Sequence, residues 1–116
     1  MQVRLCFVPC GGGPIDYVRD VDVPVLPVTG DYVIVADHEP DGASGEVATF
    51  RVRRRWWSFD MVVVQDQDAA PRQESVRVFV ECEFAKGPSA SENHLANYER
   101  HARATGVQVV FDDSMT

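Results

Sequence analysis

The clearest folding signal in the chain is the stretch VRVFVECEF, residues 76–84. Its side chains alternate with a period of two, as in a strand that has one face in a core. The residues expected to face inward are Val76, Val78, Val80, Cys82 and Phe84, and those expected to face outward are Arg77, Phe79, Glu81 and Glu83. The stretch therefore predicts a half-buried strand in a sheet.

Further strands are predicted before this stretch. Residues 2–8 alternate apolar and polar side chains until a proline and a triple glycine end the run. Residues 32–36 are a run of mostly β-branched residues, which favours a strand. Residues 16–28 are interrupted by two prolines, so they predict an extended edge segment or a loop, with at most a short strand.

The middle of the chain predicts two strands joined by a reversal. Residues 46–57 alternate again, with Arg54 as an exception on the apolar face. The apolar face is expected to hold Ala48, Phe50, Val52 and Trp56, and the opposite face Arg51, Arg53, Arg55 and Trp57. Residues 58–60 predict a tight reversal into a strand at residues 61–65, and the polar residues 66–75 predict a loop.

A helix is predicted near the C-terminus. Ser89 and Glu92 match a capping box, and Gly106 is a typical residue after a helix end, so the helix spans about residues 90–105. Its core stripe is expected to consist of Leu95, Tyr98 and Ala102. Residues 107–111 alternate and predict a final strand after the helix.

Together these elements predict one mostly β (α+β) domain over residues 1–116. The expected architecture is a small, strongly bent antiparallel sheet or an SH3-like barrel of five to six strands, with one C-terminal helix followed by a final strand. An open antiparallel sheet with the helix on one face is the alternative.

Charge and cysteine content narrow the class of protein. Eighteen acidic residues against eleven basic ones give a formal charge of −7, which opposes binding along a nucleic-acid backbone unless the basic residues are gathered in one place. Three cysteines do not make a disulfide framework, and the N-terminal residues do not read as a signal peptide or a membrane span. We therefore expect a cytoplasmic protein, of bacterial or phage type, with no membrane partner.

The basic residues are gathered in part in the stretch FRVRRRWWSF, residues 50–59. On a regular strand, one face of this stretch would carry Arg51, Arg53, Arg55, Trp57 and Phe59, which are the predicted binding residues. Guanidinium groups beside aromatic rings occur in protein-binding hot spots and in single-stranded nucleic-acid sites. The plain structural alternative is that the arginines form cross-strand ion pairs with Glu81 and Glu83, or with Asp31 and Asp37.

No motif in the sequence predicts catalysis. Cys10 precedes a triple glycine, but no arginine closes a short anion-binding loop as a phosphatase-type thiol site requires. The same glycines lack the Gly-Lys-Ser/Thr ending of a phosphate-binding loop. We therefore expect a protein that is not an enzyme and that uses no cofactor.

A metal site is not predicted either. Its ligands would be Cys6, Cys10 and Cys82 with one of the helix histidines, but the spacing is irregular and Cys-x-x-Cys pairs are absent. His94 and His101 lie seven residues apart on one helical face and are expected at the surface or its boundary. His38 lies in an acidic turn.

The sequence thus predicts a non-enzymatic macromolecular binding protein, most simply a small acidic protein–protein interaction or inhibitor module. An immunity protein or a phage anti-defence protein is an example of that class. The alternative is a small barrel that binds single-stranded nucleic acid through residues 51–57. A homodimer through Trp57 and Phe59 stays open as well.

Overall fold

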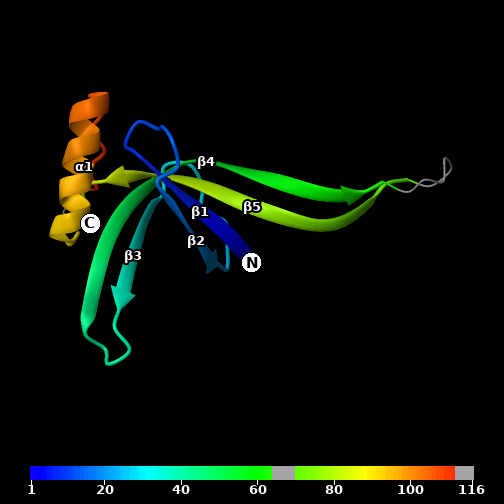
Figure 1. Cartoon of the computed structure of the whole chain (residues 1–116), viewed down its shortest axis with the longest axis horizontal. Coiled ribbons are helices and arrows are strands. Elements are labelled where there is room, and N and C mark those ends of the chain that lie inside the picture. The colour runs from blue at the N-terminus through cyan, green and yellow to red at the C-terminus, as the bar shows by residue number, and fades with distance from the viewer. Residues whose placement is uncertain (64–69, 112–116) are drawn as a thin grey trace.

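The computed structural model describes residues 1–63 and 70–111. These residues form the strands β1 (Gln2–Val8), β2 (Tyr17–Asp22), β3 (Tyr32–His38), β4 (Ser44–Val62) and β5 (Arg72–Ala85), and the helix α1 (Glu92–Thr105). The strands make one sheet in the order β2-β1-β5-β4-β3, with α1 beside one end of it (Figure 1). The predicted mostly β fold with one C-terminal helix is confirmed.

The sheet is mixed and strongly curled. Three neighbouring pairs are antiparallel, but β1 and β5 run parallel, so the prediction of an antiparallel sheet is wrong at this pair. The reason is topological, because β5 returns to the centre of the sheet alongside β1 after the chain has passed through β3 and β4. The curl brings the two edge strands together, and Arg19 of β2 donates two hydrogen bonds to Asp37 of β3 at 2.7 and 2.8 Å.

The core lies inside the curl. Phe7, Phe50 and Phe84 meet there, with ring centroids 4.1 Å apart for Phe7–Phe50 and 5.2 Å apart for Phe50–Phe84. The inward residues predicted for β5 from Val78 to Phe84 are buried, as the alternation indicated. We call this side of the sheet the inner face and the opposite side the outer face.

β4 is longer than predicted. It runs without a break through residues 58–60, which pair with Arg77, Val76 and Ser75 of β5. The predicted reversal there is therefore wrong, because continued pairing with β5 keeps these residues extended. Met61 and Val62 also belong to β4, and Arg72 to Ser75 belong to β5. The remaining parts of the predicted strand and loop, at residues 64–69, lie outside the described residues.

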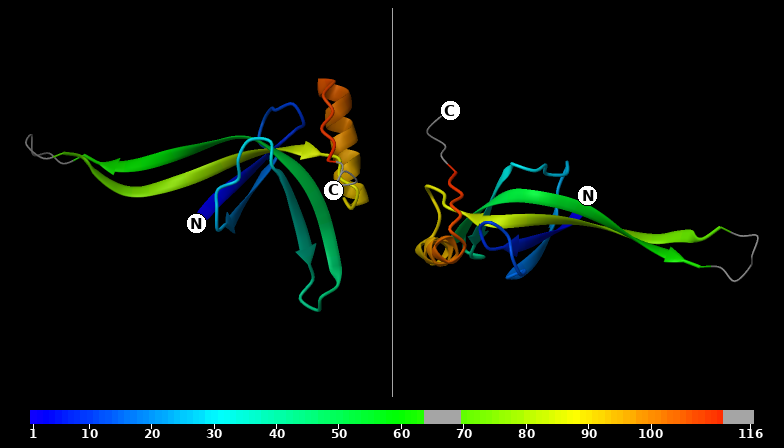
Figure 2. Two further views of the ribbon diagram at one scale, coloured as in Figure 1. Left: turned by 180° about the vertical axis from the view of Figure 1, so that it is seen from behind. Right: turned by 90° about the horizontal axis from the view of Figure 1, so that it is seen from above.

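The far halves of β4 and β5 project from the rest of the molecule as a two-stranded ribbon. We call residues 54–62 and 72–78 the arm, and the remainder of the described chain the body (Figures 1 and 2). The molecule measures 58 × 39 × 27 Å, with a radius of gyration of 17.8 Å. A compact domain of this length would have a radius of gyration of about 13 Å. The arm accounts for the elongated shape.

α1 packs its histidine-containing stripe against the sheet. Its N-cap is Ser91 rather than the predicted Ser89, and the Ser91 hydroxyl accepts a hydrogen bond from the Val47 N–H of β4 at 2.8 Å. Its C-cap is Gly106, as predicted, in the left-handed conformation with φ 73°. The buried residues of α1 are His94 and Tyr98.

Residues 107–111 make less structure than predicted. Their strand is reduced to a single parallel bridge between Lys86 and Val110. Lys86 donates its N–H to the Val109 carbonyl and accepts the Phe111 N–H, both at 2.8 Å. The end of the described chain thus follows the continuation of β5 on the side where β1 also pairs.

Candidate functional site

A β-bulge at Arg53 divides the predicted binding residues between the two faces of the sheet. Val52 pairs with Cys82 and Arg54 pairs with Glu81, so β4 has one residue more than β5 at this point. Such an insertion shifts the alternation of the bulged strand by one residue. The prediction that Arg51, Arg53, Arg55, Trp57 and Phe59 share one face is therefore wrong, because it assumed an unbroken period of two.

The outer face carries a ladder of ion pairs. Arg51 lies 3.1 Å from Glu83, while Arg53 and Arg54 lie 3.0 and 3.2 Å from Glu81. Both glutamates are almost completely covered, with exposed fractions of 5% and 3%. A buried carboxylate is costly unless it is paired and hydrogen-bonded, so these arginines have a structural role. For Arg51 and Arg53 the structure therefore agrees with the ion-pair alternative.

The triple-glycine loop belongs to the same ladder. The Gly11 N–H donates to Glu83 Oε1 at 2.8 Å. Gly12 has a positive φ of 100°, and a Cβ there would collide with the Arg53 guanidinium. Glycine is needed at this position because the backbone is left-handed and approaches a side chain closely. The loop after Cys10 thus packs the outer face and holds Glu83.

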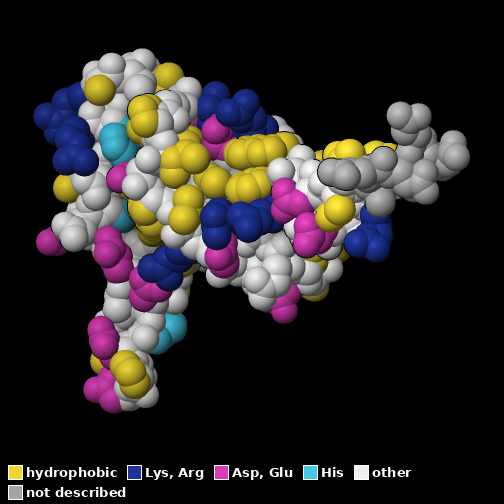
Figure 3. All heavy atoms as spheres, turned by 45° about the vertical axis from the view of Figure 1, so that its right-hand side comes forward, with side chains coloured by type: hydrophobic (Ala, Val, Ile, Leu, Met, Phe, Trp, Pro, Cys, Tyr) yellow, Lys and Arg dark blue, Asp and Glu magenta, His cyan; other side chains and the backbone are white. Residues whose placement is uncertain are grey.

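The arm presents a different surface on its inner face. Trp57, Phe59 and Met61 of β4 and Val76 of β5 point to the same side, beyond the end of the core. Their exposed fractions are 47%, 57%, 50% and 44%. We call these four residues the apolar arm surface. Figure 3 shows a band of hydrophobic side chains across the middle of the molecule, with further ones along the arm.

Arginines flank the aromatic residues of the arm. The Arg55 guanidinium lies 5.7 Å from the Trp57 ring centroid, within reach of a cation–π interaction. On the outer face Trp56 stacks on Phe79 with ring centroids 5.2 Å apart. The arm carries four arginines against two carboxylates, a net charge of +2, whereas the remainder of the chain carries −9. The arm is thus the basic part of an acidic protein.

The cysteines do not form a reactive site. Cys6, Cys10 and Cys82 are all buried and free. Burial raises the pKa of each thiol, and raises the pKa of Cys82 to about 12. The Cys10 thiol donates to the Val107 carbonyl at 3.4 Å. A thiol held protonated in this way is a poor nucleophile.

The helix histidines are packing residues. The prediction that His94 lies at the surface or its boundary is wrong, because its ring stacks on Phe84 with centroids 5.0 Å apart and is 2% exposed. His101 makes an edge contact with the same phenylalanine, and its Nδ1 is buried without a partner. Burial lowers the pKa of His101 below its ordinary value. In residues 1–63 and 70–111 no three His, Cys, Asp or Glu side chains are grouped to hold a metal ion.

Comparisons with known proteins add no further information on this surface. No protein-family model, curated protein or solved structure matches the chain. Within the part of the chain that the structure describes, no helix is long and apolar enough to cross a membrane.

Two residues of the apolar arm surface, Met61 and Val76, are not among the predicted binding residues. Met61 was assigned to a separate strand, although it continues the alternation of Trp57 and Phe59. Val76 was expected to be inward, and it does lie on the inner face, but the core does not extend this far. The uninterrupted spacing of residues 57, 59 and 61 is the signal that identifies the arm.

Proposed function

We propose that the protein is not an enzyme and that it acts by binding another protein through the apolar arm surface. The observation that supports this proposal is the exposure of Trp57, Phe59, Met61 and Val76 side by side on a projecting ribbon. Contiguous exposed apolar side chains are typical of interaction sites, and aromatic residues contribute strongly to protein hot spots. A two-stranded ribbon is also only marginally stable by itself in water, so a partner would stabilise it.

A protein partner is favoured over a nucleic acid because of where the arginines lie. Arg51, Arg53 and Arg54 are engaged by buried glutamates, which leaves little positive charge on the basic stretch for phosphates. The remainder of the chain carries −9 and would repel a nucleic-acid backbone. The crosslinking experiment described next also detects nucleic-acid binding by stacking on Trp57.

An arm that projects from a body suits an inhibitor, because it can reach into a groove of its partner while the body stays outside. Immunity and phage anti-defence proteins are the examples of this class that we propose, with action in the cytoplasm. The partner would be recognised through aromatic and aliphatic side chains of the arm, with flanking arginines setting the register.

The experiment that tests this function is photo-crosslinking in the native host. A photoreactive phenylalanine analogue replaces Phe59 in one variant and Arg103, an exposed residue of α1, in a matched control. We expect a discrete protein adduct from position 59 and none from position 103. An adduct that nuclease removes, or equal crosslinking from both positions, would contradict the proposal.

A further inference from the structure

The edge of β5 is covered in two places and free in a third. β1 pairs with residues 79–83 of β5, and Val110 bridges Lys86 farther along the same side. Among the described residues, no strand pairs with residues 72–77 on that side. β5 therefore offers an open strand edge along the arm, next to the start of β1. This edge is regular from Arg77 to Ser75, because the register with β4 shifts at Glu74.

The backbone groups of Val76 point out of this open edge. In an antiparallel ladder, residues alternate between directing both their N–H and C=O at one neighbour and directing both at the other side. Lys86 directs both groups at residues 109–111, on the side of β1. Counting along β5 by twos, Val78 and Val76 point the same way, and Val76 lies beyond the part of β1 that pairs with β5. Its N–H and C=O are thus free to pair with an added strand.

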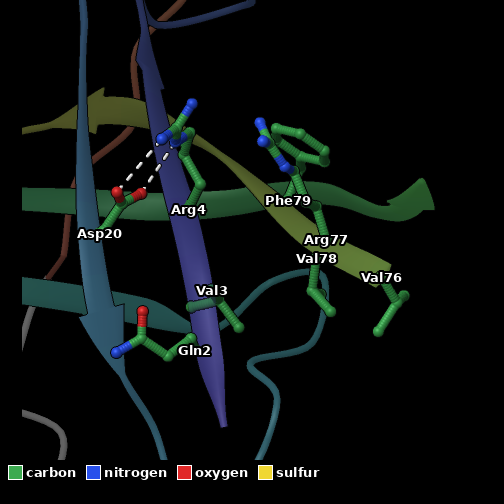
Figure 4. A pocket seen from close by; sticks show the side chains of 8 residues that line it. All are labelled: Gln2, Val3, Arg4, Asp20, Val76, Arg77, Val78 and Phe79. Carbon is green, nitrogen blue, oxygen red and sulfur yellow. Dashed lines mark hydrogen bonds and ion pairs between the residues drawn. The ribbon is translucent and has the colours of Figure 1, made fainter. Parts of the chain in front are cut away.

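A hollow of about 230 Å³ lies where the paired part of β1 ends and the unpaired part of β5 begins. Val3, Val76 and Val78 line one side of it, on the inner face of the sheet. Arg77 and Phe79 point to the opposite side of β5, next to Arg4 of β1 (Figure 4). A strand added here would meet apolar side chains on one face and an arginine-rich surface on the other.

The charged residues beside this hollow favour a ligand that carries a carboxylate. Arg4 is already engaged, because it donates to both oxygens of Asp20 at 2.8 and 3.1 Å. Arg77 has no carboxylate within ion-pair distance among the residues that the structure describes. An acidic side chain on the added strand would complete the pairing of Arg77 on the outer face.

We infer that residues 75–77 of β5, on the body side of the register shift at Glu74, accept an extended segment of the partner as an additional strand, and that this segment alternates apolar and acidic side chains. Its apolar residues lie beside Val76 and Val78, and its carboxylates lie beside Arg77. This inference rests on the proposed function and specifies how the arm binds. Main-chain hydrogen bonds supply affinity in such strand addition, and the alternate side chains supply specificity.

A second copy of the arm fits this edge less well than an acidic segment. Apart from Arg54, which pairs with Glu81 outside the arm, each arm carries three arginines against two carboxylates. Two arms placed edge to edge would therefore bring net positive charges together. The acidic segment has the opposite charge. The charge balance therefore favours a partner other than the arm itself.

The first test uses synthetic peptides with blocked ends, followed by NMR on the isotopically labelled full chain. The probe is an octapeptide of alternating valine and glutamate, and the controls are the valine–lysine analogue and an isomer with the same composition in blocks of two. We expect the alternating acidic peptide to bind at least ten-fold more tightly than either control, with the largest shifts at residues 72–78 and at the start of β1. Absence of binding, or equal binding of the lysine analogue, would overturn the inference.

The second test separates the strand edge from the apolar arm surface. Val76→Pro removes the outward N–H without removing a bond to β4, and Val76→Ala is the matched control that keeps this N–H. We expect Val76→Pro to lose peptide binding at least ten-fold relative to Val76→Ala, and to reduce the crosslink from position 59. If Val76→Pro keeps both, the strand addition is wrong while the proposed function stands. If the parent chain gives no protein crosslink at position 59, the proposed function fails.

Hydrogen exchange on the unmodified chain keeps the inference testable should the proline variant not fold. The Val76 amide is expected to exchange at least ten-fold more slowly when the acidic peptide is saturating. An unchanged exchange rate with the peptide bound would overturn the strand addition.

Discussion

At the scale of single residues, the outer face of the sheet is organised by two buried glutamates. Glu81 and Glu83 each accept hydrogen bonds from arginines of β4, and Glu83 also accepts one from the glycine loop. A buried charge is tolerated only when such partners surround it. Arg51 and Arg53, which the sequence predicts as binding residues, thus cover the buried glutamates of a structural ion-pair network.

This network predicts that Arg53→Glu destabilises the fold. The substitution removes one partner of Glu81 and places a third carboxylate beside two buried ones. We expect a loss of about 2–3 kcal/mol in the free energy of unfolding, less than for a fully buried pair because Arg53 is partly exposed. Arg55→Glu is the matched control, with a change within about 1 kcal/mol. Urea denaturation measures both, and equal midpoints would refute the structural role of Arg53.

The cysteines predict a second residue-scale result. Because burial raises the pKa of all three thiols, each is less ionised in the native protein than an exposed cysteine at the same pH. We expect iodoacetamide to leave Cys6, Cys10 and Cys82 unmodified in the native chain and to alkylate all three after unfolding in urea. Mass spectrometry reads out the modification. Rapid alkylation of native Cys10 would contradict both its burial and the proposal that the protein is not an enzyme.

His101 predicts how stability depends on pH. Its pKa is lowered in the folded state, mainly by burial, while the unfolded chain keeps the ordinary value of 6.5. As the pH falls through 6.5 the unfolded state takes up a proton first, so the free energy of unfolding decreases until the pH passes the lower, folded pKa. We expect His101→Leu to lose less stability than the parent chain between pH 7.5 and pH 5.5 in urea titrations. An equal or larger loss in the variant would contradict this.

At the scale of elements, alternation predicted which segments form strands but not how long they are. β1 and β5 follow their period-two patterns, β3 forms from the predicted run of β-branched residues, and β2 is the short strand expected beside prolines. β4 was divided at residues 58–60, although these residues include neither glycine nor proline to favour a tight turn. Pairing with β5 decides the length of β4, and that pairing is not visible in local sequence.

The bulge at Arg53 and the burial of His94 could not be read from the sequence for a similar reason. A bulge without glycine leaves no residue signature in a run of arginines. The alternation therefore predicts one face for residues that the structure divides between two faces. His94 is one residue before the expected stripe residue Leu95, and a rotation of α1 about its axis exchanges them. Which side of a helix is buried depends on the sheet against which it packs.

At the scale of the whole molecule, the projecting arm is the property that separates this chain from a compact small barrel. Small-angle X-ray scattering of the monomer tests it directly. We expect a radius of gyration near 18 Å, whereas an arm folded back onto the body would give about 13–14 Å. A value in the lower range would refute the extended arm.

We propose that the arm, rather than the body, binds the partner. The test uses a variant in which an Asn-Gly turn joins Ser58 to Arg77, two residues that pair between β4 and β5. This variant lacks the end of the arm but keeps the aromatic core. The matched control replaces residues 39–43, the tip between β3 and β4, with the same turn. Both variants are compared with the parent chain for binding of the protein captured from position 59, after circular dichroism has established that they fold. We expect the shortened arm to lower affinity at least a hundred-fold, while the tip variant binds like the parent chain. If the folded chain without the end of the arm still binds the partner, the arm is not the binding element.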